Sequence, residues 1–172
     1  MALITKTEIA KYREISKSLR DEKINPYIDD AEFLDLRPML GASLYHDLVA
    51  NKADAKYVEL MEGGDYQYNG ETYYFPGLKK VLCLFAYARY VMFGSNTDTS
   101  FGFVQKSNQD STPVPDITKK TIYTKDRQAA VEYFAEIAAF LSRNKDTYPK
   151  WRTGSCGRTG FGGFRISKIT KD

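Results

Sequence analysis

Histidine and cysteine are scarce in this sequence of 172 residues, which contains one histidine, His46, and two cysteines, Cys83 and Cys156. Imidazole titrates near neutral pH and is the commonest zinc ligand, so its scarcity removes much of the usual catalytic and metal-binding repertoire. Two isolated cysteines form neither a disulfide framework nor a Cys-x-x-Cys metal site. We therefore expect a reducing compartment, and a protein with no catalytic residues, no metal site and no cofactor.

Long hydrophobic runs are missing as well. No apolar stretch reaches the roughly 18 residues that a membrane span requires, and the N-terminal segment becomes polar at Thr5. A secretory signal would need a longer apolar region there. We therefore expect a protein that stays in the compartment where it is made and does not enter a membrane.

The single histidine and the carboxylates give a weak case for an enzyme. His46 stands in a Leu-Tyr-His-Asp-Leu sequence typical of a helix surface or an interface, and adjacent helical residues such as His46 and Asp47 do not face each other. One carboxylate cluster could bind a divalent cation or act as an acid/base pair. It alternates with apolar residues, as a solvated helix face does. The cluster consists of Asp29, Asp30, Glu32 and Asp35.

Apolar residues recur at helical spacing along most of the chain. The pattern predicts an all-α fold, a helical bundle of about five to six helices. A capping box, Thr5-x-x-Glu8, opens the first helix. Asn25-Pro26 opens the second, which should end before Pro38 because proline disfavours helical geometry in the preceding residue. The predicted helices span 6–19, 26–37, 39 or 41 to 50, 54–61, 78–93 and 129–141, the last beginning as early as 123 and ending near 144.

Two segments interrupt the helical pattern. Residues 66–75 alternate around Asn69-Gly70, the best short-range signal for a two-residue hairpin turn, and predict a small β-hairpin insertion. Residues 94–119 are polar with isolated apolar anchors, and such long loops in compact domains are usually functional or disordered. We expect this loop to contact another subunit or a further protein through Phe101, Phe103, Val104 and Lys106.

The C-terminal segment differs from the rest in charge. Residues 143–172 carry eight basic side chains against Asp146 and Asp172, a net charge of +6, which leaves −3 for the rest of a chain whose total is +3. We therefore divide the chain into a helical domain, 1–151, and an extended, basic, Gly-rich C-terminal arm, 152–172. The residues expected to bind a partner are Trp151, Arg152, Arg158, Phe161, Phe164, Arg165, Ile166 and Lys168.

A cationic arm with aromatic residues has alternative roles. Lysine and arginine release counterions from phosphates and aromatic rings stack on unpaired bases, so the arm could bind nucleic acid. The alternation in 164–170 could instead add a strand to the sheet of a partner protein. In an isolated chain the terminus could stay disordered. We favour ordering on a partner.

Four segments, taken in their order and spacing, resemble a phage family of helical head-tail connector proteins, which form the neck or adaptor ring. The family occurs in phages and prophages of Bacteroidetes-type hosts and in crAss-like phages. The resemblance covers most of the chain but not the Gly-rich tail. Its segments are Asn25–Leu48, Tyr74–Lys80, Thr99–Lys106 and Tyr148–Trp151.

The resemblance implies a structural role and no reaction. Such connectors assemble in the host cytoplasm and become part of the virion neck as dodecameric rings beneath the portal protein. The ring prolongs the DNA channel, meets DNA without sequence specificity, helps retain the packaged genome and presents a surface to tail or further neck proteins. By this resemblance, the arm should reach the portal or a neighbouring subunit, and the loop should bridge subunits or face the tail.

Three hypotheses follow from the sequence. The leading one is a connector subunit, because ring closure joins one patch of a subunit to a different patch of the next and suits a chain with oppositely charged regions. The second is a nucleic-acid-binding protein that uses the basic arm. The third is an enzyme built around Asp29, Asp30 and Asp35 or around His46.

Overall fold

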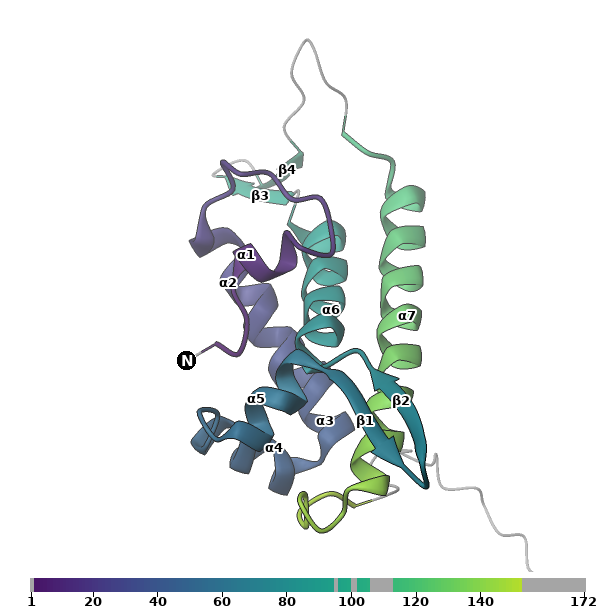
Figure 1. The fold of residues 1–172 in the computed structure, drawn as a ribbon. Coiled ribbons are helices and arrows are strands. Elements are labelled where there is room, and N and C mark those ends of the chain that lie inside the picture. Colours follow the sequence, from purple (N-terminus) through teal and green to yellow (C-terminus); the bar gives the residue numbers. More distant parts are fainter. Residues whose placement is uncertain (1, 95, 100–101, 106–112, 153–172) are drawn as a thin grey trace, which may run out of the picture.

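The computed structural model describes residues 2–94, 96–99, 102–105 and 113–152, with side chains for all of these except the segments within 96–105. Helix α6 (Leu78–Phe93) lies between α2 (Asp21–Asp30) and α7 (Asp116–Arg143) and packs against both (Figure 1). The described chain is mostly helical and carries small antiparallel hairpins. The prediction of a helical fold with a small hairpin is confirmed, whereas the predicted arm lies outside the described residues.

Helix α6 forms the centre of the core and has the bounds that the sequence predicts. Its apolar residues cover nearly every side, so it can bury one face on α2 and the other on α7. It starts directly after Gly77, whose φ is +74°. A Cβ atom at this position would lie 2.4 Å from the carbonyl carbon of Glu62. Glycine therefore allows the chain before α6 to pass close to the preceding helix.

The second helical region is longer than the sequence predicts and also begins earlier. It continues without a break from α2 through the π-helical segment η1 (Ala31–Leu36) into α3 (Arg37–Leu40), so the predicted end before Pro38 is wrong. In η1, the Arg37 N–H donates to the carbonyl oxygen of Glu32, five residues back. This wider turn has already shifted the hydrogen-bond ladder where the proline stands, so the missing N–H of Pro38 does not end the helix.

The predicted first helix, 6–19, is wrong beyond its first turn. Helix α1 (Lys6–Ile9) is followed by turns, in which the hydroxyl groups of Ser16 and Ser18 hydrogen-bond to each other at 2.9 Å. Serine side chains compete with the helical backbone for hydrogen bonds, which favours such turns. The apolar spacing arises because Ile15 and Leu19 pack against the core from these turns.

The following elements agree with the sequence. The hairpin turns at Asn69 and Gly70, whose φ values of 52° and 81° are those of a two-residue primed turn. Its second strand brings Phe75 against α7, where the ring stacks on Phe140 with 3.9 Å between centroids. The elements are α4 (Ala42–Ala50), α5 (Ala55–Glu62), β1 (Gly64–Tyr68) and β2 (Glu71–Phe75).

A second hairpin lies within 94–119, which the sequence predicts as a loop. Strands β3 (Asn96–Thr99) and β4 (Gly102–Gln105) pair in antiparallel register. Each strand has four residues, the shortest length at which alternation is recognisable in a sequence. The loop prediction is therefore wrong for these two strands.

Helix α7 begins at Asp116, well before the predicted start near residue 123. Two of its buried positions in this first part are occupied by Lys119 and Asp126. The continuous apolar stripe that marks a helix in the sequence therefore starts only at Ala130. Among the described residues, no helix combines the length and the apolar character needed to cross a membrane.

Candidate functional site

Trp151, near the end of the described chain, packs against helix α7. Its side chain is 7% exposed, its ring meets that of Phe134 edge to face at 6.3 Å, and its indole N–H donates to the Ser142 hydroxyl at 3.1 Å. Nearby, the buried Tyr148 donates its hydroxyl to the carbonyl oxygen of Lys56 at 2.7 Å. A buried indole with a satisfied N–H leaves little surface for a partner, and the binding of a partner by Trp151 stays a prediction.

Most of the other predicted partner-binding residues lie outside the described part of the chain. Arg152 is exposed where the described chain ends, and Phe103 and Val104 belong to strand β4. The residues outside the described chain are Phe101, Lys106, Arg158, Phe161, Phe164, Arg165, Ile166 and Lys168.

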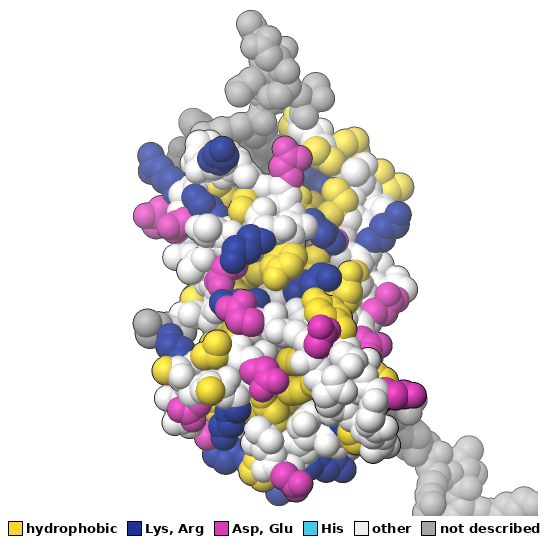
Figure 2. Space-filling model, viewed as in Figure 1, with side chains coloured by type: hydrophobic (Ala, Val, Ile, Leu, Met, Phe, Trp, Pro, Cys, Tyr) yellow, Lys and Arg dark blue, Asp and Glu magenta, His cyan; other side chains and the backbone are white. Residues whose placement is uncertain are grey.

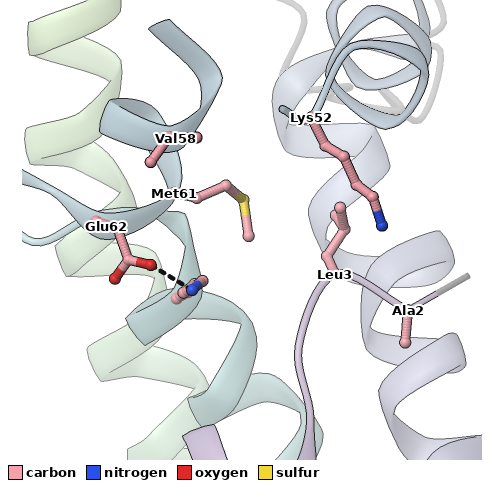
Figure 3. Close-up of a pocket in the computed structure, with 7 residues that line it drawn as sticks. Ala2, Leu3, Lys52, Val58, Met61 and Glu62 are labelled. Atoms are coloured by element: carbon pink, nitrogen blue, oxygen red, sulfur yellow. Dashed lines mark hydrogen bonds and ion pairs between the residues drawn. The ribbon is translucent and has the colours of Figure 1, made fainter. Parts of the chain in front are cut away.

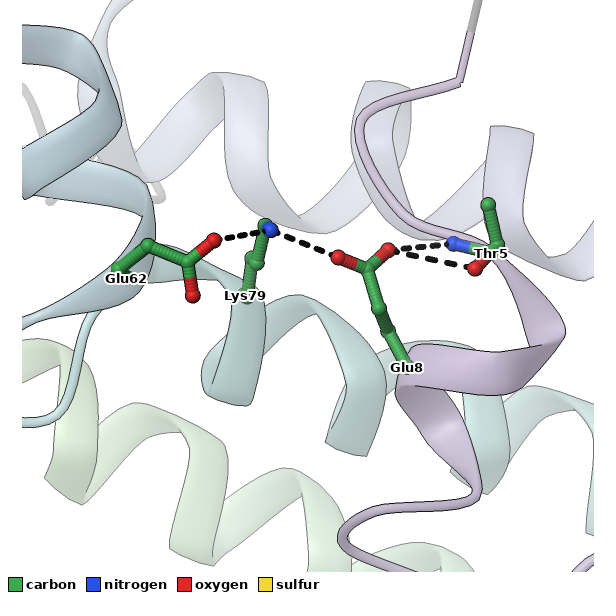
Figure 4. Close-up of polar contacts among 4 residues, drawn as sticks. All are labelled: Thr5, Glu8, Glu62 and Lys79. Atoms are coloured by element: carbon green, nitrogen blue, oxygen red, sulfur yellow. Dashed lines mark hydrogen bonds and ion pairs between the residues drawn. The ribbon is translucent and has the colours of Figure 1, made fainter.

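Lys79 joins α6 to α1 and α5 (Figure 4). Its Nζ lies 2.7 Å from Glu8 Oε1 and also pairs with Glu62, while Glu8 accepts the Thr5 N–H at 2.8 Å, as the predicted capping box requires. Burial raises the pKa of Glu8, but hydrogen bonds from Lys79 and Thr5 outweigh this effect and leave the pKa below its ordinary value. Hydrogen bonds to Glu62 and Glu8 raise the pKa of Lys79. The cluster therefore holds three helices together and offers no free base.

A cavity of about 170 Å³ lies beside this cluster, between the N-terminal segment, α5 and α6. Leu3 and Met61 project into it from opposite walls (Figure 3). Its carboxylate, Glu62, is already paired with Lys79. The cavity suits a single apolar side chain and has no group arranged for acid–base chemistry. Its lining consists of Ala2, Leu3, Lys52, Val58, Met61, Glu62 and Lys79.

Asp47 ties the end of the described chain to α4 and α5. Its carboxylate accepts the Tyr57 hydroxyl and lies 2.8 Å from Lys150 Nζ, and these two hydrogen bonds lower the pKa of Asp47. His46 is exposed and meets the ring of Tyr45 edge to face at 5.8 Å. Within the described residues no hydrogen bond joins His46 to Asp47, so the histidine lies on a helix surface, as the sequence predicts.

Two members of the predicted carboxylate cluster are buried, so the prediction of a fully solvated face is wrong. Glu32 accepts the Leu3 N–H at 2.5 Å, whereas Asp35 accepts from Arg89 Nε at 2.7 Å and lies 2.8 Å from an Arg127 nitrogen. Glu32 and Asp35 stand four and seven residues after the buried Ile28, so helical spacing already places both of them on the inward face. Burial raises the pKa of Glu32 despite its hydrogen bond to Leu3.

Neither a metal cluster nor a reactive thiol is found among the described residues. No group of three or more His, Cys, Asp or Glu side chains in them could hold a metal ion. Cys83 is fully buried in α6, and this burial raises the pKa of its thiol to about 12. A protonated, enclosed thiol is a poor nucleophile.

One outward helix face combines carboxylates with an exposed aromatic ring. It lies on α2 and the start of η1, opposite the buried Ile24 and Ile28. Phe33 on this face is 55% exposed, with the Arg37 guanidinium 4.5 Å from the centre of its ring. We call this the α2 face; it consists of Glu22, Pro26, Asp29, Asp30 and Phe33, all exposed.

A second outward face lies along the first two thirds of α7. Ile117 near the start of this helix is 76% exposed and Val131 is 53% exposed. Hydrophobic side chains gather on the surface around the start of α7 (Figure 2). We call this the α7 face; it consists of Ile117, Lys120, Thr124, Lys125 and Val131, all exposed.

A comparison with protein-family models matches residues 36–160 to a family of unknown function, DUF6712. The chain belongs to the DUF6712 family. The matched range includes Lys79 and Glu62, Asp47 and the α7 face, whereas Glu8 and the α2 face precede it. None of the curated proteins or solved structures compared with the chain matches it.

The ion pairs between distant segments are the features that sequence reasoning missed in this DUF6712 chain. Arg13, in the turns after α1, lies 2.7 Å from Asp126 of α7, and Arg89 pairs with Asp35. Arg89 carries a usable signal, because a charged residue inside an apolar helix needs a partner of opposite charge. No comparable signal marks Arg13, which stands in a polar stretch.

Proposed function

We propose that this protein is a structural virion protein, a head-tail connector subunit. In this role it forms a ring under the portal, extends the DNA channel and provides the platform on which the tail docks. The observation that carries the proposal is the resemblance of four segments, in order and spacing, to the connector family. Most of their residues fall within the described chain.

Three of these segments pack together as one scaffold. Tyr148 of the last segment and Phe75 of the second both contact the ring of Phe140, at 5.7 and 3.9 Å between centroids. The first segment joins the last through the ion pair between Asp47 and Lys150 at 2.8 Å. The residues that carry the resemblance are therefore those that determine how the helices pack. This packing supports a fold shared with connectors. The contacts form within a single chain and do not require assembly.

The exposed apolar side chains support an assembling protein. Phe33 and Leu34 on η1, and Ile117 on α7, are all more than half exposed. Clusters of large apolar side chains at a surface mark interaction sites more often than scattered ones do. A ring of identical subunits would cover such residues on neighbouring copies.

Native mass spectrometry of the purified full-length chain, together with protein identification in purified virions, tests this proposal. We expect a closed homo-oligomer, a dodecamer by the resemblance, and we expect the chain among the proteins of the mature particle in about the copy number of the portal. A chain that is strictly monomeric and absent from virions would contradict the proposal.

The second candidate function is nucleic-acid binding by the arm, favoured by the net charge of +6 on residues 143–172. A gel-shift salt series on the full chain and on a chain ending at Arg152 separates it from the connector role. If the arm binds nucleic acid, affinity for DNA falls steeply with salt and disappears with the deletion. A connector gives weak, non-specific binding at most.

A further inference from the structure

The α2 face and the α7 face lie on opposite sides of the molecule. Helix α6 packs against both α2 and α7 and stands between them (Figure 1). The buried side of each outer helix is turned toward this shared neighbour, so the exposed sides are turned away from each other. A head-to-tail contact between identical chains needs two different surfaces on each chain, and these two faces, turned away from each other, meet that need.

The two faces carry an excess of opposite charge. The α2 face presents three carboxylates around an exposed ring that also carries the Arg37 guanidinium. The α7 face presents two ammonium groups beside exposed aliphatic side chains, with the exposed carboxylate of Glu132 next to Val131. None of the three carboxylates and two ammonium groups takes part in an ion pair within the part of the chain that the structure describes. The carboxylates are those of Glu22, Asp29 and Asp30, and the ammonium groups are those of Lys120 and Lys125.

We propose that the α2 face of one copy docks on the α7 face of the next copy. The contact covers Phe33 and Ile117, and it brings the carboxylates of Asp29 and Asp30 toward the lysines of α7. Apolar anchors supply most of the energy of such an interface, while the charges determine which surfaces meet. This inference rests on the ring assembly proposed above and assigns the surfaces that form it.

The same charges disfavour the simplest alternative, a symmetric dimer. Such a dimer pairs a surface with its own copy. Two α2 faces would then bring carboxylates together, and two α7 faces would bring ammonium groups together. Like charges that meet at an interface oppose association. Pairing through these faces therefore favours head-to-tail growth of the assembly.

Charge reversal of one face at a time tests the pairing. One variant, K120E/K125E, makes the α7 face acidic, and the other, D29K/D30K, makes the α2 face basic. All four side chains are exposed, so both variants should fold. By analytical ultracentrifugation, each variant alone should associate at least about tenfold more weakly than the wild type.

An equimolar mixture of the two variants gives the decisive test. In the mixture, the acidic α7 face of one variant meets the basic α2 face of the other, and the two unchanged faces also match. We expect assembly to return, with both variants present in equal numbers by native mass spectrometry. The matched control, K17E/K145E, reverses two exposed lysines that belong to neither face and should assemble like the wild type.

The outcomes separate this pairing from the proposed function. If the wild type assembles and either single-face variant assembles equally well, or if the mixture stays dissociated, the pairing is wrong and the connector role stands. If the control also dissociates, the effect is one of net charge and the pairing is wrong. If the wild type is monomeric at every concentration, the ring itself and the pairing that rests on it are both wrong.

Discussion

The Arg89 guanidinium of α6 donates to the Asp35 carboxylate of η1 at 2.7 Å, and an Arg127 nitrogen of α7 lies 2.8 Å from the other oxygen of the same carboxylate. The Asp35 side chain is 3% exposed. One buried carboxylate therefore links the central helix to a neighbour on each side. Such an arrangement is sensitive to the loss of the shared anion, because two guanidinium groups would then be left together.

Replacing Asp35 with alanine should destabilise the fold strongly. Removing one partner of a buried ion pair leaves an uncompensated charge, and we expect D35A to lower the free energy of unfolding by about 3 kcal/mol. The matched control D30A removes an exposed carboxylate that has no ion-pair partner among the described residues, and it should change the free energy of unfolding by less than about 0.5 kcal/mol. Urea denaturation followed by circular dichroism measures both. Equal, small changes would show that the carboxylate does not hold the helices together.

Gly77 should tolerate alanine less well than Gly70 does. Both have positive φ values, +74° and +81°, so both variants suffer backbone strain of about 1–2 kcal/mol. Only at Gly77 would the new Cβ atom meet other atoms, since nothing lies within 4 Å at Gly70. We expect G77A to melt several degrees below G70A in thermal denaturation. The same melting temperature for both would mean that the close approach to Glu62 relaxes freely.

The acid dependence of stability should change in opposite directions in two variants. The folded state lowers the pKa of Glu8 below its ordinary value of 4.5, so this carboxylate stabilises the fold above that pH and the contribution is lost as the pH falls through the folded pKa. The folded state raises the pKa of Glu32, so its contribution instead declines as the pH rises above 4.5.

Urea denaturation between pH 3 and 7 measures these contributions. We expect E8Q to make stability less dependent on pH in the acid range, because the Glu8 contribution is removed. We expect E32Q to make the loss of stability in acid steeper, because an opposing contribution is removed. Parallel profiles for the two variants would contradict the pKa directions derived from the structure.

Trp151 should matter to stability and the residues after Arg152 should not. The indole packs on Phe134 inside the helical domain, so W151A should cost about 3–5 kcal/mol, as deletions of large buried aromatics do. A chain that ends at Arg152 retains every described core residue and should melt like the full chain. A large drop in its melting temperature would mean that the C-terminal segment is part of the core.

The elements predicted correctly from the sequence are those whose pattern is purely local. The turn at Asn69-Gly70 requires two positive φ values and so fixes the hairpin, and α6 is apolar on nearly all sides. The prediction fails where charged side chains occupy buried positions, as Lys119 and Asp126 do in α7. The partner of Asp126 is Arg13, from a distant part of the chain, and a local pattern does not contain such a pair.

The candidate sites show the same limit. Asp35 stands seven residues after the buried Ile28 and so lies on the inward helix face, but its ion pairs with Arg89 and Arg127 join segments far apart in the sequence. Trp151 borders the basic arm in the sequence, and in the structure its ring packs against Phe134 of α7. In both cases the surroundings of the side chain come from tertiary contacts, which a local pattern does not contain.

The most direct test of the connector role is a cryo-EM map of the neck of the virion with this chain traced in it. The account predicts a closed ring of identical copies directly beneath the portal, around a central channel, with Phe33 of η1 and Ile117 of α7 covered by neighbouring copies. A neck without this chain, or this chain as an isolated copy elsewhere in the particle, would contradict it.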